Sequence, residues 1–193
     1  ILNQVLGIIQ ETGNIRREQF ILELLIQAFQ KMQKTTGITY AELAEYQDRW
    51  DTISKAVERC DKALKGLDKI PPLLQKGKID SAFNLLHTIM KNVSDEDDVQ
   101  SMANVYTMFA TAYADIEDYP NALKYMKDSL ELHKKLWSWE AIHFCQGNIA
   151  NFYWNLNPPN KDEARRNAEA VFALCEEFGV VPDPMIRDMC NEI

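Results

Sequence analysis

Hydrophobic side chains recur along most of the chain at steps of three and four, the spacing that places them on one side of an α-helix. The clearest run lies within residues 39–68, where eight apolar positions alternate these two steps without a break. It predicts a seam like that of a coiled coil, packed either against other helices of the chain or against a second chain in a homodimer. The seam residues are Leu43, Tyr46, Trp50, Ile53, Val57, Cys60, Leu64 and Leu67.

Residues that favour helix ends divide this pattern into separate helices. The N-terminal caps that we expect are Thr39 with Glu42, Ser94 before the acidic turn 95–97, Asn160, and Asp183 before Pro184. The glycines that we expect after the last turn of a helix are Gly13, Gly37, Gly77 and Gly179. The helices predicted are 2–12, 15–35, 39–68, 79–92, 96–116, 119–136, 139–156, 161–178 and 184–192. Since no strand pattern remains, the expected fold class is all-α.

The Pro71-Pro72 pair stands between two of these helical stretches. Proline lacks a backbone donor and clashes with the preceding turn, so a continuous helix cannot pass through the pair. We therefore expect two domains: residues 1–68 as a helical hairpin or bundle, and residues 69–193 as a second helical unit.

Small and aromatic residues repeat in the second unit. Ala82, Ala122 and Ala164 open similar amphipathic helices at intervals of 40 and 42 residues. In the preceding helices, Tyr106, Phe109, Ala110 and Tyr113 correspond to Gln146, Ile149, Ala150 and Tyr153. A small side chain lets the backbone of a neighbouring helix approach, while the flanking rings fill the grooves beside it.

These residues resemble the tetratricopeptide repeat over about residues 67–179, although the intervals exceed the roughly 34 residues usual in that family. Glu117 also stands where a glycine is usual, and Gln146 replaces the first aromatic residue of its repeat. The resemblance implies antiparallel helix pairs in a right-handed superhelix, whose concave face binds proteins or peptides. The last predicted helix, 184–192, would cap the array.

The composition of the chain limits the classes of partner that we expect it to bind. The chain of 193 residues is 46% hydrophobic and 26% charged, and its formal net charge of −8 opposes binding to nucleic acid. Its most apolar run, Phe20–Phe29, is too short to insert into a membrane. Four cysteines without metal-ligand spacing favour free thiols and a cytoplasmic location.

Catalytic chemistry has no support in the sequence. His87, His133 and His143 share no ligand spacing, so we expect neither a metal site nor another cofactor. Neither a phosphate-binding glycine loop nor a nucleophile motif occurs. The sequence therefore favours a protein that is not an enzyme and has no catalytic residues.

The candidate binding residues are polar positions on the first helix of each pair. Asn148, Asn151 and Asn155 form one helical stripe with Trp154 nearby, and the corresponding helix of the preceding repeat carries Asn104, Thr107 and Thr111. Asparagine amides in a groove can bind a peptide backbone by donating and accepting together. The alternative interpretation is an exposed polar face. Trp137 and Trp139 are expected to pack between repeats rather than to contact a ligand.

The resulting hypothesis is a non-catalytic adaptor or scaffold that binds a protein or peptide on the concave face of its repeats. One alternative is a regulatory sensor that responds to a peptide and acts through its N-terminal helices. Another is a structural homo-oligomer held together by the seam of residues 43–67.

Overall fold

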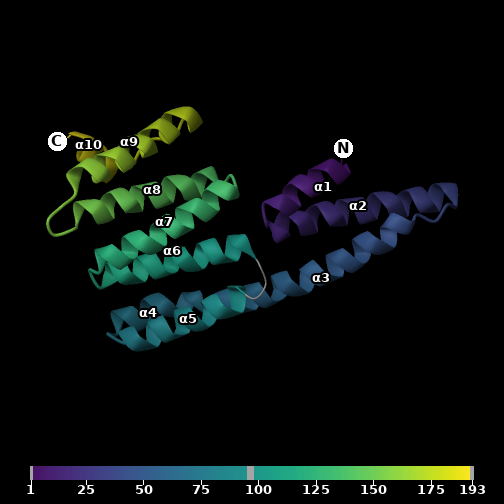
Figure 1. Ribbon diagram of the computed structural model, residues 1–193, viewed down its shortest axis with the longest axis horizontal. Helices are drawn as coiled ribbons and strands as arrows, with labels where there is room; N and C mark the ends of the chain where they lie inside the picture. Colours follow the sequence, from purple (N-terminus) through teal and green to yellow (C-terminus); the bar gives the residue numbers. More distant parts are fainter. Residues whose placement is uncertain (1, 95–97, 192–193) are drawn as a thin grey trace.

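The computed structural model describes residues 2–94 and 98–191, and it is all-α over this part of the chain, as predicted (Figure 1). The elements are α1 (Leu2–Glu11), α2 (Ile15–Thr36), α3 (Ala41–Leu64), a short 3₁₀ helix η1 (Leu67–Lys69), α4 (Ile70–Gln75), α5 (Ile79–Ser94), α6 (Val99–Asp115), α7 (Tyr119–Lys135), α8 (Trp139–Trp154), α9 (Lys161–Phe178) and α10 (Pro184–Asn191).

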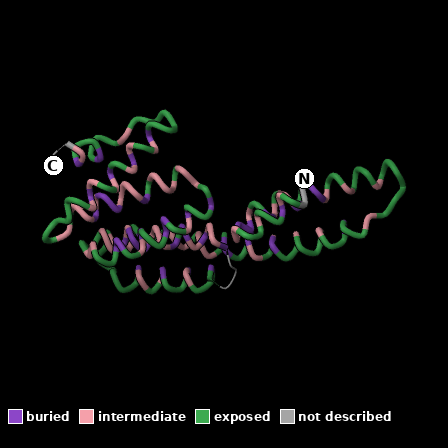
Figure 2. The backbone as a smooth tube through the Cα atoms, turned by 45° about the horizontal axis from the view of Figure 1, so that its top comes forward, coloured by how far each residue is buried: buried purple, intermediate pink, exposed green. Residues whose placement is uncertain are grey.

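Helices that follow one another in the chain pack side by side. Contacts join α6 to α7, α7 to α8, α8 to α9 and α9 to α10, and Figure 1 shows these helices stacked in chain order. The α2–α3 hairpin extends away from this stack, with α1 lying along α2. Figure 2 shows the buried residues gathered where neighbouring helices meet. A right-handed superhelix remains a prediction.

The small residues lie where the sequence pattern predicts close helix contacts. Ala110 and Ala122 have no exposed surface and share one hydrophobic cluster between α6, α7 and α8. Ala150 and Ala168 are equally buried in a cluster between α8, α9 and α10. Rings fill the adjacent space, since Phe109 and Tyr125 stack with their centroids 4.7 Å apart. Alternation of small and aromatic residues thus accompanies close packing of consecutive helices.

Helix α3 belongs to two hydrophobic clusters. Its first part contributes Ile53 and Val57 to a cluster with Leu22 and Leu25 of α2. Its last part contributes Cys60 to a different cluster, formed with α4, α5 and α6. The seam is therefore packed inside the chain, whereas the division into domains at residue 68 remains a prediction.

An ion pair between a partly exposed arginine and a buried aspartate also joins the hairpin to the stack. Asp98 directly precedes α6, and its side chain is fully buried. It accepts hydrogen bonds from Arg16 Nε at 3.1 Å and from Ser101 Oγ at 2.6 Å. Arg16 Nη2 also donates to Asp61 of α3 at 2.7 Å. Burial acts to lower the pKa of Arg16, but the hydrogen bond to Asp61 and the charge of Asp98 raise it above its ordinary value. One guanidinium thus connects α2, α3 and α6.

Several predicted helix ends are confirmed. Asn160 accepts a hydrogen bond from the backbone N–H of Glu163 at 3.2 Å, and Asp183 accepts one from that of Met185 at 2.8 Å. All four glycines expected at helix ends have positive φ, which residues with a side chain rarely adopt.

Two predicted caps are wrong. Helix α3 begins at Ala41, and Tyr40 precedes it without a side-chain cap, so Thr39 and Glu42 do not form a capping box. Ser94 is the last residue of α5, whereas Asp98 caps α6 by accepting from the Ser101 N–H at 3.2 Å. The acidic turn 95–97 lies outside the described residues.

The prolines at 71 and 72 begin a helix that the sequence pattern missed. They occupy the first turn of α4, where backbone N–H groups have no partner within the helix and their loss is tolerated. The preceding long helix ends at Leu64, four residues before the predicted position.

Among the described residues, no helix combines the length and hydropathy needed to cross a membrane.

Candidate functional site

Helix α8 is packed on two sides and open on a third. Ile149 and Phe152 are buried towards α7, and Ala150 is buried towards α9. The remaining side carries a stripe of residues at steps of four, three and four. We call this set the α8 stripe; it consists of Phe144, Asn148, Asn151 and Asn155.

The amides of the α8 stripe bond to their own helix. Asn148 Nδ2 donates to the Phe144 carbonyl at 2.9 Å, and Asn155 Nδ2 donates to the Asn151 carbonyl and to Asn151 Oδ1, both at 2.8 Å. Each amide has two donor hydrogens and an oxygen that accepts twice, so these bonds leave capacity for a ligand. Phe144 is 48% exposed at one end of the stripe. The stripe thus offers an apolar ring beside polar groups that can pair with a peptide backbone.

The corresponding stripe of α6 lies 40 residues earlier and has a different composition. It consists of Asn104, Met108, Thr111 and Asp115. Asn104 is exposed and accepts a hydrogen bond from Gln100 Nε2 at 3.4 Å, whereas Thr111 donates to the Met108 carbonyl at 3.0 Å. The predicted residues Asn104 and Thr111 thus occupy the same side of α6 that the asparagines occupy on α8.

Two other predicted residues lie in packing contacts. Thr107 Oγ1 is 2.8 Å from Ser129 Oγ of α7, and it also donates to the Ala103 carbonyl at 3.1 Å. Trp154 packs against the cluster between α8, α9 and α10, and Lys161 Nζ lies 5.2 Å from its ring centroid. Neither side chain belongs to the open stripes, so we do not include them among the ligand contacts.

A pocket of about 210 Å³ joins the α8 stripe to α10. Its lining residues are His143, Phe144, Gly147, Asn148, Val171, Asp183, Met185 and Ile186. Sequence reasoning missed Phe144, although it stands four residues before Asn148 and so continues the same stripe. No sequence pattern predicted that α10 would line this pocket, because the position of α10 depends on the path of residues 179–183.

A histidine and a cysteine lie close together beside this pocket. His143 Nε2 is 3.2 Å from Cys175 Sγ. Burial raises the pKa of the Cys175 thiol above its ordinary value, which favours the protonated form over the nucleophilic thiolate. The residues that the structure describes also contain no group of three or more His, Cys, Asp or Glu arranged to hold a metal ion.

The two tryptophans at the start of α8 have different environments. Trp139 stacks on Phe178 of α9 with centroids 4.4 Å apart, so it packs within one helix pair and not between repeats as predicted. Trp137 is 81% exposed and has a φ of 52°, so the prediction that it packs between repeats is wrong. The chain turns in the left-handed region after α7, and this turn directs the Trp137 ring outward.

The resemblance to the tetratricopeptide repeat rests on the residue pattern alone. No protein-family model matches the chain, and a comparison with curated proteins finds no match either.

Proposed function

We propose that the chain is a non-catalytic adaptor that binds a protein or peptide segment along the open stripes of α6 and α8. This proposal rests on one observation. The exposed Phe144 ring is followed, along the same side of α8, by three asparagines whose amides retain hydrogen-bonding capacity. An extended peptide presents alternating side chains and backbone amides. The ring can hold an apolar side chain, and the amides can pair with the adjacent backbone.

The test replaces Asn148, Asn151 and Asn155 with alanine in one variant. Each lost amide contact should weaken binding by about 1 kcal/mol, so affinity should fall by roughly 150-fold in total. Thermal stability should stay equal or rise slightly, because asparagine is a poor helix former. Affinity purification from a native lysate, quantified by mass spectrometry, identifies the partner, and calorimetry then measures its binding.

The control replaces Asn84 and Asn92, which are exposed on α5 outside both stripes. This variant should retain the partner at native affinity. Native affinity in the triple variant, with folding verified by circular dichroism, would place recognition elsewhere on the molecule.

A regulatory sensor is the second candidate function, and the Arg16 contacts favour it. Arg16 of α2 bonds to Asp98 at the start of α6, the helix that carries one of the two stripes. A ligand that shifts α6 would change this bond and alter the α2–α3 hairpin. Binding of the purified partner should then change hydrogen exchange in α2 and α3 of the native chain but not of an Arg16→Met variant. Unchanged exchange in the native chain would leave the adaptor as the sole proposal.

A further inference from the structure

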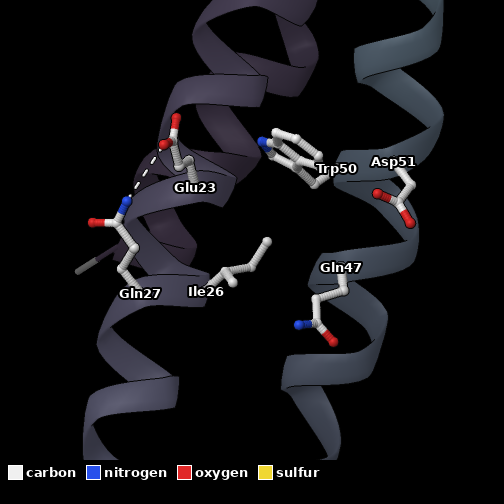
Figure 3. A pocket seen from close by; sticks show the side chains of 6 residues that line it. All are labelled: Glu23, Ile26, Gln27, Gln47, Trp50 and Asp51. Carbon is white, nitrogen blue, oxygen red and sulfur yellow. Dashed lines mark hydrogen bonds between the residues drawn. The ribbon is translucent and has the colours of Figure 1, made fainter.

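The α2–α3 hairpin contains a pocket of its own, far along the chain from the two stripes. Its volume is about 400 Å³, within the range of about 300–1,000 Å³ that is usual for ligand sites. Figure 3 shows Ile26 of α2 and Trp50 of α3 pointing towards one another across the gap. The other lining residues are Glu23, Gln27, Gln47 and Asp51.

The charge of this pocket is negative. Glu23 on α2 and Asp51 on α3 are both exposed, and no lysine, arginine or histidine is among the lining residues. Within the described part of the chain, the hydrogen bond that Glu23 Oε1 accepts is a neutral one, from Gln27 Nε2 at 3.3 Å. Since the chain also carries a net charge of −8, long-range attraction favours a cationic ligand.

Trp50 adds two further features. Its half-buried indole forms part of the pocket wall, and the face of an indole attracts cations through its quadrupole. Its Nε1 is buried, and no atom of the described residues accepts a hydrogen bond from it. An unpaired buried donor is unfavourable. Because Nε1 has no exposed surface, a ligand in the pocket can reach the indole face but not this N–H.

We propose that this pocket binds the guanidinium group of an arginine presented by a partner polypeptide. A guanidinium is planar, stacks on an aromatic ring and carries five donors, which suits carboxylates that approach from two helices. The side-chain oxygens of Gln27 and Gln47 provide further acceptors at the rim.

The test titrates the full chain with the capped peptide Gly-Ser-Arg-Ser-Gly and follows the indole N–H signals by NMR. The chain has four tryptophans, and a Trp50→Phe variant assigns the signal of Trp50. We expect a saturable shift of that signal. The peptide with citrulline in place of arginine has nearly the same shape without the charge, and it should bind at least about tenfold more weakly. The lysine peptide should bind with an intermediate affinity.

Variants locate the site. Glu23→Gln and Asp51→Asn should each weaken binding of the arginine peptide by about twofold to fivefold. Asp48→Asn, which removes an exposed charge from the same helix but outside the pocket lining, should leave the affinity unchanged. Equal binding of the arginine and citrulline peptides, equal binding of the lysine peptide, or an equal loss in Asp48→Asn would overturn the proposal. The Asn148, Asn151 and Asn155 variant should bind this peptide normally, which separates this test from that of the proposed function.

Discussion

Replacement of Asp98 by alanine is the most informative perturbation of the fold. The carboxylate caps α6 by accepting from the Ser101 N–H at 3.2 Å, and it is also paired with Arg16 at 3.0 Å. The substitution removes both interactions and leaves the Ser101 hydroxyl without its acceptor. Arg16 is held less firmly but keeps its bond to Asp61.

The loss can be estimated from these contacts. Removal of a helix cap costs about 1 kcal/mol. Hydrogen bonds to a charged group contribute about 1.5–3 kcal/mol, and the lower part of this range applies because about a third of the Arg16 side chain is exposed. Asp98→Ala should therefore lower the free energy of unfolding by about 2.5–3 kcal/mol.

Asp118→Ala provides a matched control. Asp118 caps α7 in the same way, accepting from the Asn121 N–H at 3.2 Å, but it has no arginine partner among the contacts described. This variant should lose only about 1 kcal/mol. Urea denaturation followed by far-ultraviolet circular dichroism measures both losses. Equal losses in the two variants would refute the reasoning, because the Arg16 pair would then contribute nothing measurable.

Three further perturbations test the packing and its pH dependence. Ala110→Leu should destabilise the chain by about 1–3 kcal/mol in urea denaturation, because Ala110 has no exposed surface and a larger side chain overpacks the contact. Gly13→Ala should cost more than Gly37→Ala: both glycines have positive φ, but only at Gly13 would the new methyl lie 2.8 Å from Val99. Burial lowers the pKa of His133 below about 6.5, so the unfolded chain takes up a proton first and stability should fall as the pH drops below about 6.5. Denaturation midpoints at pH 5.5 and 7 measure this loss.

Different results would contradict each of these expectations. A neutral Ala110→Leu would exclude a tight contact between α6 and α7, and equal costs at the two glycines would exclude the steric term at Val99. For the pH dependence, His133→Gln should reduce the slope of stability against pH. An unchanged slope in the His133 variant would assign the dependence to other groups.

The helices could be predicted from the sequence because their signals are local. Asn160 and Gly179 mark the two ends of α9 through hydrogen bonds and a backbone angle that involve only nearby residues. Prolines 71 and 72 were harder to interpret, since proline both breaks a helix and favours its first turn. Which effect applies depends on where the preceding helix ends, and that end lies at Leu64.

The candidate site could be predicted only in part. The spacing of Asn148, Asn151 and Asn155 predicted a shared side of one helix, which requires no knowledge of distant segments. The Thr107 contact with Ser129 and the Arg16 contact with Asp98 join residues 22 and 82 positions apart, so no local pattern contains them. The proximity of α10 to Asn148 likewise depends on the tertiary path of the chain.

Because α3 contributes side chains to two clusters, the directions of these two sets of side chains around the helix axis must stay constant relative to each other. Its 24 residues form a rod about 36 Å long, and each residue advances the side chains by about 100° around the axis. A single residue inserted between Val57 and Cys60 would rotate the α3 side chains on one side of the insertion by about 100° relative to those on the other side. The side chains of one cluster would then face away from their partners, while those of the other cluster would keep their contacts. An insertion of seven residues would return the side chains close to their original directions and would mainly lengthen the rod. Tolerance to insertions in this helix should therefore follow the helical period rather than the size of the insertion.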